Sequence, residues 1–282
     1  MRQNDTVIIG VIGTGVTGKG LVELALNAGC SVILKSRQES TLENAMTIIS
    51  GKFSKKMDPD ELQNTLSNVE TTTRFESLSR ADIIIESVVE DLHIKRDLFQ
   101  KLELICNDDT VLASNTSSLS ISKIATYLQY PNRVVGLHFF NPIPKMSLVE
   151  IIKGDKTSSA VIEKCRNIAI KLNKTPIVAK DSPGFIVNRL LFSMINEGCC
   201  LLEEGVANVE DIDTAMKLGT RHPMGPFELA DLIGIDLCAE ISTNLNKCFD
   251  DDNKFKCGTL LLQTLVNEKR YGQKSRKGFY DY

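Results

Sequence analysis

Three residues of this chain combine a hydroxyl, an imidazole and a carboxylate close to short apolar segments. They are Ser117, His138 and Glu150. Histidine titrates near neutral pH, so His138 can take a proton from an alcohol or return one to a carbonyl oxygen. A lone carboxylate in an apolar segment is costly, so Glu150 needs a partner, and His138 is the natural one. The set predicts acid–base chemistry on a hydroxyl or carbonyl group; a purely structural ion pair is the alternative.

The segments that carry these residues resemble strands of a buried sheet. Residues 110–113, 134–137 and 148–152 are short apolar runs closed by polar residues, a pattern typical of strands covered on both faces. In an open α/β sheet the ligand crevice lies beyond the carboxyl ends of the strands. We therefore expect Ser117 and His138 to face the same crevice.

A glycine-rich motif follows the first predicted strand. Residues 7–12 lead directly into Gly13-Thr14-Gly15-Val16-Thr17-Gly18, and an apolar helical stretch comes next. Gly-x-Gly-x-x-Gly between a strand and a helix is typical of dinucleotide binding. The first glycine permits the turn, the second lets a pyrophosphate approach, and the third lets the helix pack closely. The motif predicts that this loop binds a dinucleotide; a merely structural glycine turn is the alternative.

The end of the second predicted strand, Ser31–Lys35, bears on the choice of coenzyme. NAD-binding domains usually carry an acid there for the ribose hydroxyls, whereas this chain has Ser36 and Arg37. Arg37 can form a charge-assisted hydrogen bond to a 2′-phosphate, and Ser36 can donate another. We therefore predict a preference for NADP over NAD. In the alternative, Arg37 is a solvated charge and Glu39 serves the ribose.

Composition is that of an ordinary globular protein. The chain has 282 residues, of which 42% are hydrophobic and 24% charged, which favours about two domains. A formal net charge of −3 gives no general reason to expect nucleic acid or a membrane surface as partner. No apolar run is long enough to span a bilayer, so we expect a cytoplasmic protein. The eight cysteines lack Cys-x-x-Cys spacing, so no metal site is predicted.

The second half of the chain is predicted to be helical. Ser182 as N-cap and Pro183 at the first helical position predict a long helix that ends near Glu204. Its apolar residues lie on more than one face, which favours a homodimer packed through this region. We expect a dinucleotide-binding domain over residues 1–184 and a helical dimerisation and substrate domain over 185–282, with Asn188 directed toward the cleft.

One further helix is predicted earlier, over residues 41–66. It carries a lysine cluster, Lys52, Lys55 and Lys56, which could bind phosphates or form a solvated helix face.

Several motifs taken together resemble the 3-hydroxyacyl-CoA dehydrogenase family, in particular its short bacterial 3-hydroxybutyryl-CoA members. The matching segments are 113–119, 137–142, 183–189, 210–216, 222–226 and 277–280. The resemblance implies a Rossmann-type doubly wound α/β sheet followed by an all-helical C-terminal domain. It also implies hydride transfer between NAD(P)H and C3 of a short acyl-CoA, acetoacetyl-CoA to (S)-3-hydroxybutyryl-CoA.

The resemblance also implies roles for particular residues. His138 would be the base and Glu150 its support, while Ser117 and Asn188 would hold substrate and coenzyme. Glu90, Lys95 and Lys274 would lie near the coenzyme, Asn141 would touch substrate, and the lysines from Lys52 to Lys56 would meet the CoA moiety. Two alternatives remain: a dehydrogenase of a small hydroxy acid without CoA, and a non-catalytic dinucleotide-binding sensor.

Overall fold

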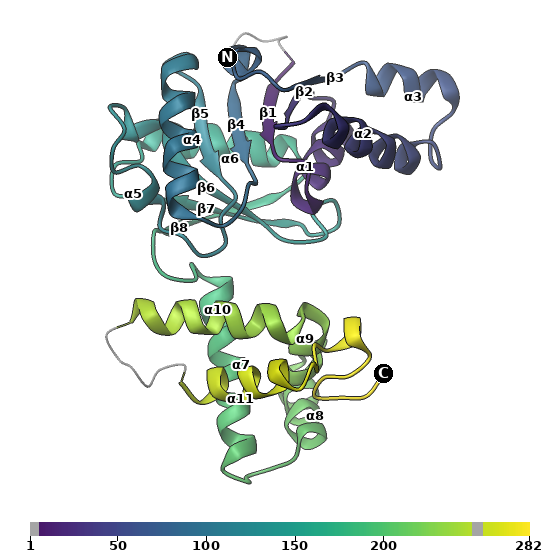
Figure 1. Ribbon diagram of the computed structural model, residues 1–282, viewed down its shortest axis with the longest axis vertical. Coiled ribbons are helices and arrows are strands. Elements are labelled where there is room, and N and C mark those ends of the chain that lie inside the picture. The colour runs from purple at the N-terminus through teal and green to yellow at the C-terminus, as the bar shows by residue number, and fades with distance from the viewer. Residues whose placement is uncertain (1–5, 250–255) are drawn as a thin grey trace. The chain divides into compact units, whose positions relative to one another are not determined.

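The computed structural model describes residues 6–249 and 256–282. The chain divides into two compact units, Met1–Ser182 and Pro183–Tyr282. Strands lie in the first unit and the second is helical (Figure 1). The sequence prediction of a doubly wound α/β sheet followed by a helical region is therefore confirmed.

The N-terminal unit is built on one sheet whose strand order is β3-β2-β1-β4-β5-β6-β7-β8. The strands from β1 to β6 are parallel, β7 runs antiparallel to β6, and β8 is parallel to β7. The order reverses between β1 and β4, which is the switch point where ligands bind in open α/β sheets. The strands are β1 (Ile8–Ile12), β2 (Ser31–Lys35), β3 (Val69–Thr72), β4 (Ile83–Glu86), β5 (Val111–Ser114), β6 (Val134–Phe139), β7 (Leu148–Lys153) and β8 (Thr175–Lys180).

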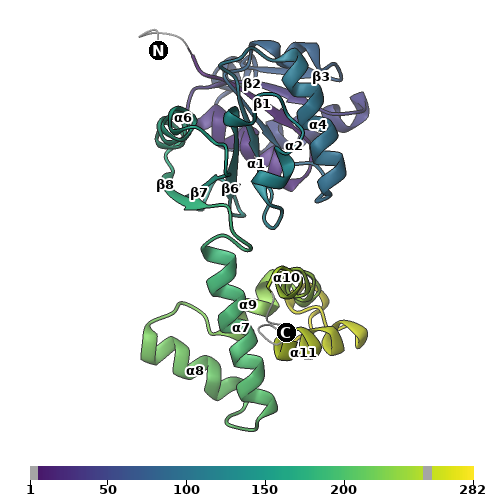
Figure 2. The same ribbon diagram turned by 90° about the vertical axis from the view of Figure 1, so that its left-hand side faces the viewer.

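Helices cover both faces of this sheet. Apolar residues of α1, α2 and α6 meet alternate strand residues such as Val11, Leu34 and Ile85. On the opposite face, Ile121 of α5 lies against Gly136 of β6, and α4 packs beside α5. Figure 2 shows α6 and α4 on opposite sides of the strands. The helices are α1 (Val16–Asn27), α2 (Glu39–Phe53), α3 (Pro59–Leu66), α4 (Leu92–Ile105), α5 (Ile121–Ile124) and α6 (Ser159–Lys171).

The C-terminal unit packs its helices around a separate apolar core. Phe192 and Ile195 of α7 meet Phe227 of α9 and Leu262 of α11 there. The helices are α7 (Val187–Glu203), α8 (Val209–Thr220), α9 (Pro226–Ile233), α10 (Ile235–Cys248) and α11 (Lys256–Asn267). Short 3₁₀ helices also occur in the two units, at Glu76–Arg80, Pro131–Arg133 and Gln273–Ser275. Among the residues described, no helix has the length and apolar character needed to cross a membrane.

Two helix predictions were wrong in their bounds. The helix predicted over 41–66 is two helices, because Asp58 caps the amide of Glu61 and Pro59 starts a new first turn. The long helix predicted to begin at Pro183 begins at Val187 instead. Gly184 and Phe185 have φ values of +72° and +50°, a left-handed backbone that cannot continue a right-handed helix.

Candidate active site

His138 and Glu150 form a buried pair across two strands. In the antiparallel ladder of β6 and β7 they lie directly opposite each other, so their side chains share one face of the sheet. His138 Nδ1 is 2.6 Å from Glu150 Oε2, and the two residues are 6% and 0% exposed. A carboxylate can only accept, so Nδ1 carries the proton and Nε2 is the nitrogen suited to exchange a proton with substrate. The predicted pairing is present in the structure.

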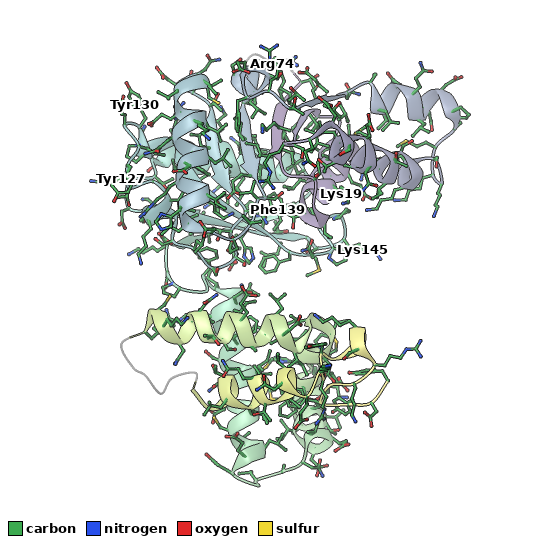
Figure 3. All side chains as sticks on the ribbon, in the orientation of Figure 1. Lys19, Arg74, Tyr127, Tyr130, Phe139 and Lys145 are labelled. Atoms are coloured by element: carbon green, nitrogen blue, oxygen red, sulfur yellow. The ribbon has the colours of Figure 1, made fainter. Side chains whose placement is uncertain are left out.

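The segment that carries Ser117 is attached to the ends of β5 and β6. The side-chain oxygen of Asn115 accepts the amide of Phe139 at 3.0 Å, and Phe139 follows His138 at the end of β6 (Figure 3). Glu90 accepts from the hydroxyl of Thr116 at 2.5 Å and from the amide of Ser117 at 3.1 Å. These bonds hold the Ser117 backbone beside the strand that carries His138.

A second buried ion pair stabilises this segment. Lys95 Nζ lies 2.7 and 2.9 Å from the carboxylate oxygens of Glu86, and both side chains are almost fully buried. Ser114, the last residue of β5, donates its hydroxyl to Glu86, and Lys95 also lies 3.3 Å from Glu90. Sequence reasoning named Lys95 and Glu90 but missed Glu86. The available signal was a carboxylate that follows directly on the apolar run 83–85.

This network sets the charge state of Glu90. Burial alone would raise its pKa, but the Lys95 ammonium and hydrogen bonds from residues 116–118 outweigh that effect and lower the pKa below the ordinary glutamate value. Glu90 is therefore ionised at neutral pH. An ionised carboxylate can accept the several donors that the 116–118 segment presents.

The glycine motif has the geometry that dinucleotide binding requires. Gly13 has a φ of +113°, and a Cβ there would lie 2.7 Å from the carbonyl oxygen of Ser87. A Cβ at Gly18 would collide with the carbonyl oxygen of Gly13, whereas no atom of the described residues lies within 4 Å of the Cβ position at Gly15. Gly15 is the N-cap residue of α1 and has no side chain that could bond to the first amides of the helix. The residues present therefore fit a pyrophosphate at this helix terminus.

A cavity of about 570 Å³ adjoins this motif within the N-terminal unit. Its lining includes Gly13, Gly15, Ser36, Arg37 and Gln38. Thr14 of the predicted set also lines it, and the Thr14 carbonyl accepts from Lys19 of α1 at 2.9 Å.

The two residues after β2 differ in what they can offer a ligand. Thr41 donates its only hydroxyl proton to the carbonyl of Gln38 at 2.8 Å, so in its 2.6 Å contact with Ser36 the serine is the donor. The Ser36 proton is thus used inside the protein, while Arg37 is exposed along the cavity. Glu39, the alternative ribose ligand, accepts from Thr73 at 3.3 Å and is not among the lining residues found in the described chain.

The remaining predicted site residues are spread over both units. Lys52 forms an ion pair of 2.8 Å with Glu23, Lys56 is exposed in the turn after α2, and Asn141 is exposed after β6. In the C-terminal unit, Asn188 is buried near the start of α7 and Lys274 pairs with Asp236. The roles assigned to these residues stay predictions.

The cysteines behave as apolar residues. Five are buried, Cys200 is half-buried and Cys248 is exposed, while the side chain of Cys257 lies outside the described part of the structure. Burial raises the pKa of the Cys106 thiol to about 11 and that of the Cys165 thiol to about 12, so these thiols are not ionised at neutral pH. Within residues 6–249 and 256–282 no group of histidine, cysteine and acidic side chains could hold a metal ion.

Comparison with known proteins gives a consistent result. The NAD-binding domain of 3-hydroxyacyl-CoA dehydrogenase matches residues 8–182, and the C-terminal domain of the same family matches residues 184–282. A 3-hydroxybutyryl-CoA dehydrogenase of Clostridioides difficile is 42% identical over 97% of this chain and 99% of its own length. The mitochondrial hydroxyacyl-coenzyme A dehydrogenase of Homo sapiens is 39% identical over 96% of this chain and 90% of its own length.

A solved structure extends the likeness to three dimensions. (S)-3-Hydroxybutyryl-CoA dehydrogenase PaaH1 from Ralstonia eutropha superposes with a TM-score of 0.91 at 33% identity, over 99% of each chain. The matches cover both units, and the buried His138–Glu150 pair lies within the matched region. The chain therefore belongs to the 3-hydroxyacyl-CoA dehydrogenase family.

Proposed function

We propose that this protein interconverts acetoacetyl-CoA and (S)-3-hydroxybutyryl-CoA by hydride transfer between a nicotinamide dinucleotide and C3 of the acyl group. The observation that carries the proposal is the 2.6 Å pair of His138 and Glu150 at the carboxyl end of β6. Its setting in a family member, in the same unit as a glycine loop that fits a pyrophosphate, supports the reaction class. The relatives named for 3-hydroxybutyryl-CoA support the short acyl chain.

His138 handles the proton in this reaction. In reduction the protonated imidazole donates from Nε2 to the C3 oxygen, and in oxidation the neutral ring takes the hydroxyl proton. Glu150 fixes the tautomer through Nδ1 and stabilises the imidazolium, because a buried carboxylate 2.6 Å away is a strong charge-assisted partner. The bound coenzyme supplies or accepts the hydride at nicotinamide C4.

Positioning residues complete the proposed site. Ser117 and Asn188 hold substrate and coenzyme, and Asn141 touches the acyl group. For Ser117, support comes from the Glu90 bonds that fix its backbone next to β6. Lys52 and Lys56 meet the CoA phosphates; because Lys52 is paired with Glu23, its role requires exchange of that partner for a phosphate.

We further propose that the enzyme uses NADP(H) in preference to NAD(H). Support comes from Arg37 on the cavity wall, from the lack of an acid directly after β2, and from the position of Glu39 outside the lining. An acid at this position would repel a 2′-phosphate, whereas a guanidinium binds it. Glu90, Lys95 and Lys274 are the further coenzyme contacts proposed.

A homodimer packed through the C-terminal unit is also proposed. Several large apolar side chains of that unit are exposed, among them Leu190 of α7, Leu218 of α8 and Leu260 of α11. Burying such side chains against a second copy of the chain would remove apolar area from water, which favours association. Light scattering at micromolar protein should give twice the chain mass of 31.2 kDa, and a monomer mass would contradict this assembly.

The test of function compares two substrates with two coenzymes. Purified protein is mixed with acetoacetyl-CoA or free acetoacetate, each with NADPH or NADH, and the loss of reduced nicotinamide is followed by absorbance. Rapid turnover of acetoacetyl-CoA with little turnover of acetoacetate is expected. Turnover of free acetoacetate alone would favour a hydroxy-acid dehydrogenase, and no turnover with any pair would favour a dinucleotide sensor. Faster turnover with NADH than with NADPH would contradict the coenzyme assignment.

A further inference from the structure

A buried lysine lines the dinucleotide cavity. Lys35, the last residue of β2, is only 4% exposed, and its Nζ lies 3.9 Å from the centre of the Phe75 ring. Both residues belong to the cavity wall. Among the residues that the structure describes, no carboxylate lies within ion-pair distance of Lys35. A buried ammonium usually forms an ion pair with a carboxylate, so contact with an aromatic face is unusual.

Two further cations line the same cavity. Arg37 follows β2, and Lys101 belongs to α4, more than 60 residues further along the chain. The only acidic residue in the described lining is Asp97, also on α4. Burial, together with repulsion from Arg37 and Lys101, lowers the pKa of Lys35 below the ordinary lysine value. The cavity therefore concentrates positive charge, and the mutual repulsion of these cations destabilises the protein when no ligand is bound.

We infer that Lys35, Arg37 and Lys101 form a subsite for a phosphomonoester on the ribose of an adenosine, and that Lys35 and Lys101 are specificity-determining residues for the coenzyme. A dianionic phosphate offers several acceptor oxygens and neutralises the mutual repulsion of the three cations. Phe75 holds the Lys35 ammonium in place before the ligand arrives. Ser36 plays no part, because it donates its hydroxyl proton to Thr41.

The inference rests on the proposed function and deepens its coenzyme assignment. The glycine motif lines the same cavity as the three cations, so one dinucleotide can place its pyrophosphate at Gly15 and its ribose phosphate at Lys35. The same chemistry also occurs in CoA, which carries a phosphate on the 3′-hydroxyl of its ribose. The position of the phosphate on the ring therefore distinguishes the two sources.

The experiment measures binding without catalysis. The affinities of full-length protein for adenosine 2′,5′-bisphosphate, adenosine 3′,5′-bisphosphate and adenosine 5′-monophosphate are determined by calorimetry. The variants are Lys101→Gln and Lys35→Met, the second of which keeps the length of the buried stem without its charge. Lys156→Gln is the matched control, because Lys156 is an exposed lysine in the loop before α6 that does not line the cavity. Thermal unfolding of each variant shows whether it is folded.

The expected result is that the 2′,5′-bisphosphate binds at least tenfold more tightly than the monophosphate. Loss of either lysine should weaken 2′,5′-bisphosphate binding about tenfold, equivalent to about 1.4 kcal/mol, and leave monophosphate binding unchanged. Lys156→Gln should behave as the unchanged protein. Should Lys35→Met fail to fold, the surface substitution Lys101→Gln carries the test by itself.

Three results would overturn the inference. They are equal binding of the 2′,5′-bisphosphate and the monophosphate, tighter binding of the 3′,5′-bisphosphate than of the 2′,5′-bisphosphate, and an unchanged affinity of Lys101→Gln for the 2′,5′-bisphosphate.

Failure of the subsite can be distinguished from failure of the proposed function. If the subsite fails but acetoacetyl-CoA is reduced with NADH, the reaction stands. If the bisphosphate binds as expected but acetoacetyl-CoA is not reduced, the subsite stands and the reaction does not.

Discussion

Replacing Glu150 with glutamine tests how the carboxylate assists His138. Glutamine has almost the same shape and can still accept from Nδ1, but it carries no charge. A hydrogen bond to a charged group contributes about 1.5–3 kcal/mol and a neutral one about 0.5–1.5 kcal/mol. Because the pair is buried and only 2.6 Å apart, we expect the change to cost about 1–2 kcal/mol of transition-state stabilisation.

That free energy corresponds to a decrease in kcat of about 5- to 30-fold. In the direction of acetoacetyl-CoA reduction the loss arises because no negative charge stabilises the imidazolium that donates the proton. The assay is the initial rate of coenzyme oxidation between pH 6 and 9, with thermal unfolding to confirm the fold. Glu163→Gln, at an exposed position of α6, is the matched control. A kcat equal to that of the unchanged protein at every pH would refute the role of Glu150.

Three further predictions concern buried or clustered charges. Lys95→Met leaves the Glu86 carboxylate buried without its counter-charge, so denaturant melts should show a loss of about 3–5 kcal/mol, partly recovered when Glu86→Gln is added. Because the pKa of Glu90 is lowered in the folded state, its contribution to stability is present above the unfolded value of about 4.3 and is lost as the pH falls through the folded value. Thermal melts of Glu90→Gln should therefore depend less on pH in acid. Because burial, together with repulsion from Arg37 and Lys101, lowers the pKa of Lys35, affinity for adenosine 2′,5′-bisphosphate should begin to fall at a lower pH than that at which an ordinary lysine titrates. Lys35→Met should lack this decline, and an identical decline in both proteins would contradict the prediction.

The strands of the N-terminal unit could be predicted from the sequence because their apolar runs are clearly bounded by polar residues. Ser31–Lys35 is apolar between polar ends, and the observed β2 has the same bounds. The glycine motif specified a strand, a turn and a helix, and all three are present. The direction of β7 could not be predicted, because an apolar run of five residues looks the same in parallel and antiparallel ladders. That direction places Glu150 opposite His138.

Other features depend on contacts that no local pattern reveals. The start of α7 is set by the left-handed backbone at Gly184 and Phe185, and phenylalanine gives no sequence signal of such a conformation. Lys101 joins the coenzyme cavity only because α4 brings it beside the end of β2. Ser36 is the donor to Thr41, a bond made within the turn that leads into α2. Sequence reasoning therefore anticipated the His138–Glu150 pair but not the hydrogen bond between Ser36 and Thr41.

In the proposed reaction His138 moves the proton during hydride transfer to an acyl-CoA. The most direct measurement compares His138→Ala with the unchanged protein in the reduction of acetoacetyl-CoA at saturating coenzyme, after equal coenzyme binding has been established by fluorescence. A kcat lower by about 10²-fold or more, with the fold and coenzyme affinity preserved, is the predicted result. Unchanged turnover in the variant would show that another group moves the proton and would contradict this role of His138.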